Sequence, residues 1–149
     1  GDEVLRQTAN LLRTVCRRSD TLVRWGGEEF LLVAKRTVRE RADRIARNIC
    51  QAMRNHIFGL ADGRTLRCTI SVGYAACPIL SHSPEACSWE DALQAADQCL
   101  YAAKRKGRDG WMGVHTPGLP DPEVVGPRLK TDVEGLAAEG LLKLRSSFD

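Results

Sequence analysis

The residue types best suited to chemistry gather in one short segment, RWGGEEF, at residues 24–30. Its glycines, Gly26 and Gly27, would let the backbone approach a ligand closely and expose amide N–H groups suited to phosphate oxygens. The carboxylates of Glu28 and Glu29 would point in different directions at a turn, so one could hold Mg²⁺ while the other does separate work. The same four residues suit an ordinary β-turn with solvated glutamates, so the motif alone leaves both interpretations open.

Two further pairs of charged residues lie outside this segment. Lys104 and Arg108 are four residues apart near the end of a predicted helix, where they form either a phosphate clamp or a solvated basic face. Arg17 and Asp20 are three residues apart shortly before the glycines. An arginine and a carboxylate can bind phosphate and guanine edges, but they also suit a helix C-terminus followed by a turn.

Length and composition limit the classes of protein to consider. The 149 residues fit one ordinary domain, and 43% apolar with 28% charged residues is a balance that argues against disorder. No apolar run approaches the length of a membrane span, and a net charge of +3 is too small to argue for nucleic-acid binding. The six cysteines include no Cys-x-x-Cys pair, which favours reduced thiols of a cytosolic protein over disulfides or a zinc site.

Apolar spacing predicts the elements that position the charged residues. Helical spacing covers residues 3–17 and 38–53, and β-rich runs at 21–25 and 30–34 flank the glycines as a hairpin. Alternation over residues 66–74 predicts a strand with one buried face. The acidic residues therefore lie at a hairpin tip.

The second half of the chain is predicted to contain a helix, a short strand and a tail. Ser88 and Asp91 form a capping box for a helix that stops at Gly107, and a strand follows near residue 111. Prolines concentrate in residues 117–127, which predicts a linker. The weak apolar stripe of residues 132–146 is typical of a frayed helix or an appendage. The order of elements is an α+β pattern of the split βαβ kind without an opening strand.

In this context the segment at 24–30 resembles the signature loop of the GGDEF family of diguanylate cyclases, in its GGEEF variant. Further stretches resemble family motifs in matching order, namely GDEVL at the start, TISVG and ADQCLYAAKRKGR. The resemblance implies an α+β, ferredoxin-like, palm-type βαββαβ fold that lacks its first strand. It predicts a partial GGDEF domain at residues 1–114, followed by a proline-rich linker and C-terminal tail at 115–149.

The resemblance also implies an activity, a metal and a partner. Family members join two GTP molecules into cyclic di-GMP and release pyrophosphate, with Mg²⁺ or Mn²⁺ at the acidic turn. Each domain holds one GTP, so catalysis implies a homodimer whose domains face each other across a twofold axis. No nucleic-acid partner is implied, and no membrane segment is predicted in this chain.

The family roles fall on particular residues. Glu28 matches the metal-binding carboxylate, and Glu29 matches the catalytic carboxylate beside it. Substrate-binding roles fall on Asp2, which would recognise guanine, and on Gly26, Gly27, Lys104 and Arg108, which would contact phosphates. Without the resemblance, Asp2 is equally well explained as a helix N-cap.

Arg17 and Asp20 match the family's R-x-x-D inhibitory site, which binds the product cyclic di-GMP. A further product-binding arginine of the family falls on Asn48, and Arg44 or Arg47 is an alternative on the same predicted helix. The resemblance therefore predicts product inhibition and leaves Asn48, Arg44 and Arg47 as alternatives for the third product ligand.

Two family residues have no counterpart, because the metal-ligating Asp of the first strand and a guanine-reading Asn would both precede Gly1. We therefore expect the parent protein to be a cyclase and this chain to be weak or inactive alone. The alternative is a catalytically inactive receptor for cyclic di-GMP or GTP, although the retained Glu28 and Glu29 favour the enzyme. A cytoplasmic location is expected, with sensing or membrane anchoring left to upstream domains.

Overall fold

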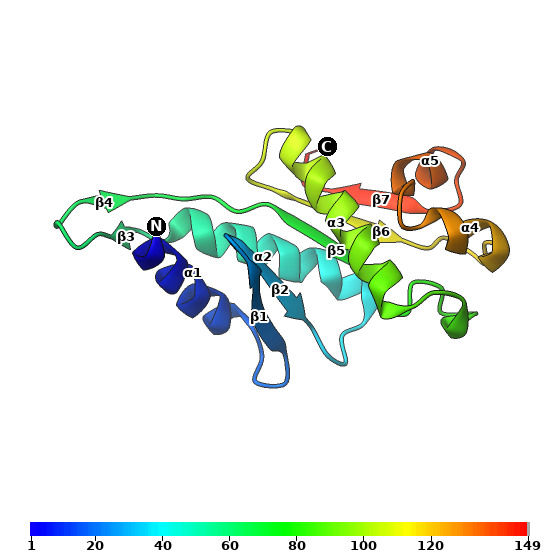
Figure 1. Ribbon diagram of the computed structural model, residues 1–149, viewed down its shortest axis with the longest axis horizontal. Coiled ribbons are helices and arrows are strands. Elements are labelled where there is room, and N and C mark those ends of the chain that lie inside the picture. Colours follow the sequence, from blue (N-terminus) through cyan, green and yellow to red (C-terminus); the bar gives the residue numbers. More distant parts are fainter. Residues whose placement is uncertain (149) are drawn as a thin grey trace.

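The computed structural model describes residues 1–148, which form helices packed around small sheets (Figure 1). The first half contains α1 (Asp2–Val15), β1 (Thr21–Gly26), β2 (Glu29–Val33), the 3-10 turn η1 (Arg39–Arg41), α2 (Ala42–Asn55), β3 (Phe58–Gly59) and β4 (Thr65–Leu66). The second half contains β5 (Val72–Ala75), the 3-10 turn η2 (Pro84–Ala86), α3 (Trp89–Arg105), β6 (Trp111–His115), α4 (Pro122–Arg128), α5 (Val133–Ala138) and β7 (Lys143–Ser146). This order confirms the predicted α+β class.

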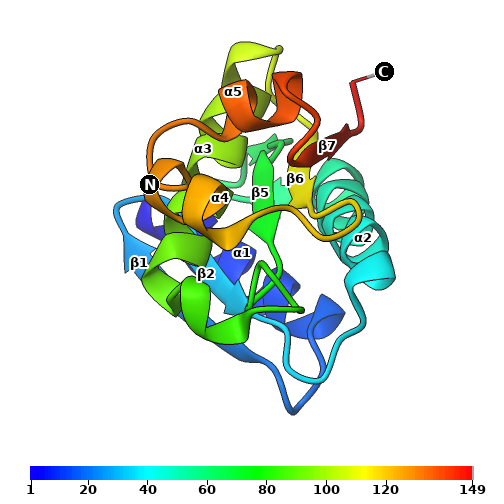
Figure 2. The same ribbon diagram turned by 90° about the vertical axis from the view of Figure 1, so that its right-hand side faces the viewer.

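The central sheet consists of β5, β6 and β7. β5 and β6 are parallel, because α3 joins them as a crossover, and β7 pairs antiparallel with the other edge of β6. Figure 2 shows α2 and α3 on opposite sides of these strands. Trp111 packs with Ala46 and Cys50 of α2, whereas Met112 and Val114 belong to the cluster that contains α3. Alternation along β6 therefore divides the core into two layers.

α3 approaches the sheet closely because the residues at the contact are small. Its buried positions are Ala92, Ala95, Cys99, Ala102 and Ala103. In β5, a Cβ added to Gly73 would lie 2.2 Å from the carbonyl oxygen of Ala96, so only glycine fits there. The predicted capping box is confirmed: Ser88 Oγ accepts from the Asp91 N–H at 3.2 Å, and the Asp91 carboxylate accepts from the Ser88 N–H at 2.9 Å.

One predicted strand is shorter than expected. Within residues 66–74, residues 67–71 lie outside any strand. β3 ends its pairing opposite Leu66, and β6 begins opposite Val72, so the backbone between them has no neighbouring strand to pair with. The side chains of Ile70, Val72 and Tyr74 nevertheless pack against the cluster under α2, which matches the predicted buried face.

Residues 116–148, here called the C-terminal segment, pack against α3 and the sheet. Val125, Leu129 and Leu136 are 0% exposed and belong to the same core cluster as α3. This differs from the expected linker and frayed helix, because the apolar side chains of α4 and α5 are buried rather than solvated. Where the domain ends along the chain stays a prediction.

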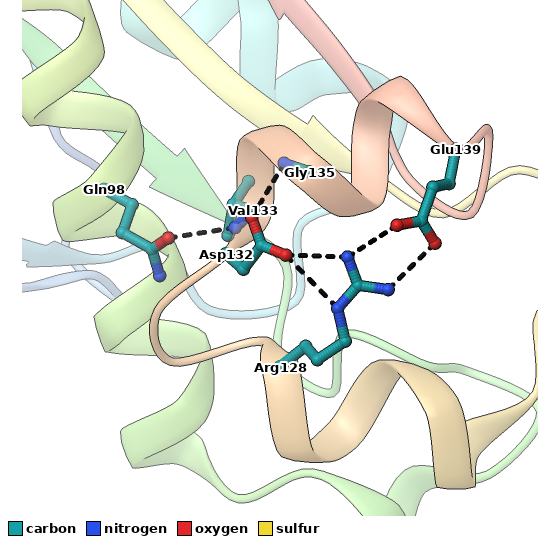
Figure 3. Close-up of polar contacts among 6 residues, drawn as sticks. All are labelled: Gln98, Arg128, Asp132, Val133, Gly135 and Glu139. Carbon is teal, nitrogen blue, oxygen red and sulfur yellow. Dashed lines mark hydrogen bonds and ion pairs between the residues drawn. The ribbon is translucent and has the colours of Figure 1, made fainter.

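Polar contacts also hold this segment in place (Figure 3). The Gln98 side-chain oxygen, on α3, accepts from the Val133 N–H at 2.9 Å. The Arg128 guanidinium donates to Asp132 at 2.6 Å and to both carboxylate oxygens of Glu139 at 2.8 Å. α4 and α5 are therefore joined to each other and to α3.

Candidate functional site

The β1–β2 hairpin presents the paired glycines and glutamates at its tip. The strands pair antiparallel up to Gly26 and Glu29, which leaves Gly27 and Glu28 as a two-residue loop. Gly27 has a φ of +51°, a conformation that such loops require and that glycine adopts without steric cost. A Cβ added to either glycine would meet no atom within 4 Å, so the space beside the loop is open.

Two basic side chains hold this loop from different elements. Arg24 Nε donates to the carbonyl oxygen of Gly27 at 2.9 Å. Lys104, in the last turn of α3, places Nζ 3.5 Å from Oε1 of Glu29. The fold thus joins the hairpin to a helix 75 residues further along the chain, while Glu28 stays exposed at the tip.

A cavity of about 370 Å³ lies between α1 and the hairpin. This Asp2 cavity is lined by Asp2, Leu5, Arg6, Ala9, Arg13, Leu22, Arg24 and Phe30. Asp2 is not the N-cap considered from the sequence: Gly1 holds that position, and Asp2 begins α1 without a side-chain capping bond. Its carboxylate lines a space within the size range of small-molecule pockets.

Arg108 is placed differently from Lys104. α3 ends at Arg105, Gly107 has a φ of +122°, and Arg108 follows in a left-handed conformation with a φ of +62°. Arg108 therefore lies beyond the helix rather than one turn after Lys104 on its surface. No hydrogen bond or ion pair joins its side chain to the hairpin within residues 1–148.

Glu28 and Glu29 can supply only one or two of the ligands of a metal ion. Within residues 1–148 no three His, Cys, Asp or Glu side chains gather as a metal-binding group. Mg²⁺ commonly takes one or two carboxylates and completes its octahedron with water and substrate phosphates. The exposed Glu28 carboxylate can serve as one such ligand, with Glu29 held toward Lys104.

Arg17 and Asp20 contact each other at the junction between α1 and the hairpin. The Asp20 side chain is only 6% exposed and accepts from the Arg17 N–H at 2.9 Å and the Lys35 N–H at 3.2 Å. Burial would raise the pKa of Asp20, but these hydrogen bonds and the Arg17 guanidinium outweigh it, so the pKa is lowered. The Arg17 guanidinium also donates to Thr37 Oγ1 at 2.6 Å and stays half exposed.

The positions of Arg44 and Arg47 on α2 differ, and these two residues are the alternatives for the third product ligand. Arg44 and Asn48 are exposed one turn apart, as residues on one helix face are. Arg47 instead lines a cavity with Trp111 and Ser147 of the central sheet. Arg44 therefore shares a helix face with Asn48, whereas Arg47 is next to Asn48 in the sequence and lies on the side of α2 that faces this cavity.

Sequence reasoning assigned no role to Arg24, Arg6 or Arg13. All three line the Asp2 cavity, and Arg24 also braces the loop. The spacing of Asp2, Arg6 and Arg13 on one helix was an available signal, because positions four and seven residues apart share a helix face. Arg24 could also have been identified from the predicted hairpin, because it lies three residues before Gly27 and its side chain can reach back to the loop.

Comparisons with known proteins identify the relatives of this chain. The family model described as "Diguanylate cyclase, GGDEF domain" matches residues 1–110. The chain is 39% identical over 114 residues to the response regulator PleD of Caulobacter vibrioides, a match that covers 76% of this chain and 24% of that protein. It is 30% identical over 109 residues to diguanylate cyclase A of Treponema denticola, covering 73% of this chain and 28% of that protein.

The structure is also similar to the crystal structure of the GGDEF domain of YfiN (TpbB) from Pseudomonas aeruginosa. The TM-score is 0.61 at 35% identity, and the match covers 72% of this chain and 64% of that chain. The chain spans about a quarter of the length of the curated relatives it matches. Within residues 1–148, none of the helices combines the length and apolar character needed to cross a membrane.

Proposed function

Since this chain belongs to the GGDEF family of diguanylate cyclases, we propose that it serves in the condensation of two GTP molecules into cyclic di-GMP with release of pyrophosphate. One observation carries the proposal: an open, glycine-containing turn bears two glutamates beside a cavity lined by a carboxylate and arginines. Such a turn can meet a triphosphate, and the cavity can take a base.

Each residue has a role that its surroundings support. Asp2 would accept from the N–H groups of guanine in the Asp2 cavity, and the backbone of Gly26 and Gly27 would pass along the phosphates. Glu28 would bind Mg²⁺ or Mn²⁺, which when bound neutralises triphosphate charge and stabilises the attacking oxygen. Glu29 would assist removal of the proton from the attacking 3′-hydroxyl, with Lys104 Nζ 3.5 Å from its Oε1.

The exposed hairpin tip suits a reaction between two domains. Each domain holds one GTP, so two copies must bring their tips together across a twofold axis. Trp25 is 54% exposed beside the loop, which leaves the tip accessible to a second copy. We place the reaction in the cytoplasm, since the six cysteines are free thiols and a reducing compartment preserves them.

Product inhibition would act at Arg17 and Asp20. The half-exposed guanidinium of Arg17 can bind a phosphate, and Asp20 can bind guanine donors if it releases a backbone partner. Lys104 and Arg108 would contact phosphates, with Lys104 already at the acidic turn.

A catalytically inactive receptor for cyclic di-GMP or GTP is the second candidate. The number of acidic side chains at the turn favours this receptor, because no third metal-binding side chain joins Glu28 and Glu29 within residues 1–148. Both candidates bind guanine nucleotides and differ in turnover.

Incubation of the full-length protein with GTP and Mg²⁺, following pyrophosphate and cyclic di-GMP, tests the proposal. We expect release of both products that stops when the metal is chelated. Absence of release, together with micromolar cyclic di-GMP binding that is lost in Arg17→Ala, would instead establish the receptor. Arg18→Ala removes a neighbouring exposed charge and serves as the matched control.

A further inference from the structure

A second cavity, of about 390 Å³, lies between α2 and the β6–β7 part of the central sheet. This Arg47 cavity is lined by Arg47, Cys50, Arg54, Trp111, Ser146 and Ser147. It shares no lining residue with the Asp2 cavity and contains no residue proposed for GTP or the metal ion. Arg47 was an alternative third product ligand from the sequence, but no contact joins it to Arg17 or Asp20 within residues 1–148. An inference drawn from it is therefore independent of the proposed function.

The charge of this cavity comes from two arginines. Arg47 and Arg54 are seven residues apart, which places them two turns apart on one face of α2, and no Asp or Glu of residues 1–148 lines the cavity. Arg54 is already held, since its Nε donates to the Asp109 carboxylate at 2.8 Å and its Nη2 to the Asp109 carbonyl oxygen at 2.7 Å. Within residues 1–148 no carboxylate pairs with Arg47, so its positive charge is uncompensated.

The rest of the lining is neutral and held in place by the backbone of two strands. The Trp111 N–H donates to Ser147 Oγ at 2.9 Å, and the Ser147 N–H donates to the Trp111 carbonyl oxygen at 3.0 Å. Trp111 is 5% exposed, so its ring is fixed by packing. The pairing of β7 with β6 brings Ser147 beside Trp111 and so forms this side of the cavity. Ser147 lies beyond the family match, which ends at residue 110.

We propose that the Arg47 cavity binds the oxyanion group of a small molecule, either a phosphate or a carboxylate. A guanidinium presents paired donors that match two oxygens of such a group, and no carboxylate of the described residues competes for Arg47. Ser146 and Ser147 give the cavity polar groups beside Arg47, and Cys50 and Trp111 complete the lining. The volume lies in the range of small-molecule pockets.

Nuclear magnetic resonance titration of ¹⁵N-labelled protein tests this site. The probes are GMP for a phosphate and malonate for a carboxylate, each at constant ionic strength, with the amide signals of Trp111 and Ser147 as the local readout. We expect saturable shifts with at least one probe and at least tenfold weaker binding in Arg47→Ala. The probe that binds identifies the source of the oxyanion.

Two further variants separate this site from general charge effects. Arg41→Ala removes an equal charge from the exposed turn η1 just before α2, and we expect its affinity to stay within twofold of wild type. Arg47→Lys keeps the charge without the paired donors, and we expect intermediate affinity. Absence of saturable shifts at Trp111 and Ser147, shifts confined to the Asp2 cavity, or equal weakening by Arg41→Ala and Arg47→Ala would overturn the proposal.

Discussion

The β1–β2 hairpin and the C-terminal segment place their side chains in opposite environments. At the hairpin tip, Glu28 and Glu29 are exposed. In the C-terminal segment, Leu129 and Leu136 are 0% exposed. Among the described residues, the larger core cluster takes its fully buried members from positions 79–142 and none from the hairpin. The glutamates proposed to contact a ligand thus lie where few contacts hold them, while the side chains of the C-terminal segment pack into the core.

The largest expected effect is on turnover, through the double variant Glu28→Gln, Glu29→Gln. Loss of the carboxylates proposed to bind the metal and to accept the proton should lower the cyclase rate of the full-length protein about a hundredfold or more, since metal-assisted charge stabilisation supplies several kcal/mol. The free energy of unfolding should change by less than about 0.5 kcal/mol, because both positions are exposed.

Pyrophosphate release and urea unfolding measure the two effects of this variant separately. Glu123→Gln, an exposed glutamate of α4, is the control and should alter neither. A large loss of stability with unchanged turnover would contradict the assignment of the hairpin to catalysis.

The reverse pattern is expected for Leu136→Ala. Removing a fully buried leucine side chain should lower the free energy of unfolding by about 2–5 kcal/mol, because a cavity remains where the core cannot collapse. Leu119→Ala, at a position 78% exposed, should have almost no effect in the same urea titration. Equal effects of the two variants would mean that the C-terminal segment does not pack as described.

Local signals predicted the hairpin and the start of α3. The two glycines specify a tight turn, and Ser88 with Asp91 specifies a cap, so both features depend on residues a few positions apart. The contact between Lys104 and Glu29 joins distant segments, and only the family resemblance placed both residues at one site.

The C-terminal segment was mispredicted because its structure depends on distant partners. The sequence LLKLRS alternates apolar and charged residues from Leu142 to Arg145, a strand pattern, but the stripe through Leu141 and Leu144 also suits a helix. Pairing with β6 selects the strand, and no local residue identifies that partner. The position of Arg108 depends likewise on the left-handed turn after α3, which places it off the helix surface.

A smaller stability effect is expected where the C-terminal segment meets α2. The Asp43 side chain is 6% exposed, accepts from the Tyr74 hydroxyl, pairs with the Arg145 guanidinium and lies 3.3 Å from His115 Nε2. Arg145→Met would leave this buried carboxylate without its arginine. We expect a loss of about 1–3 kcal/mol in urea unfolding, below the cost for a fully buried pair because Arg145 is half exposed.

Arg145→Lys keeps the positive charge and should recover part of that loss. An unchanged free energy of unfolding in Arg145→Met would show that Tyr74 and His115 satisfy Asp43 without help from β7.

The smallest expected effect is a pH dependence of the Arg128 contacts (Figure 3). Hydrogen bonds from Arg128 lower the pKa of Asp132 and of Glu139 below their ordinary values. Carboxylates with lowered pKa stabilise the fold above their unfolded values, near pH 4 to 4.5, and lose that contribution as pH falls through the folded values. The difference in urea midpoint between wild type and Arg128→Gln should therefore be constant at neutral pH and shrink toward pH 3.

The matched control lies at the other end of the chain, where Arg6 pairs with Glu3 at 2.6 Å and also lowers the pKa of that carboxyl. Arg6 is 71% exposed and contacts one carboxylate, whereas Arg128 is 33% exposed and bridges two. Solvent screens the Arg6 pair more strongly, so Arg6→Gln should shift the midpoint less at every pH. A shift in Arg6→Gln as large as in Arg128→Gln would mean that the bridging arginine stabilises the C-terminal segment no more than a single exposed ion pair does.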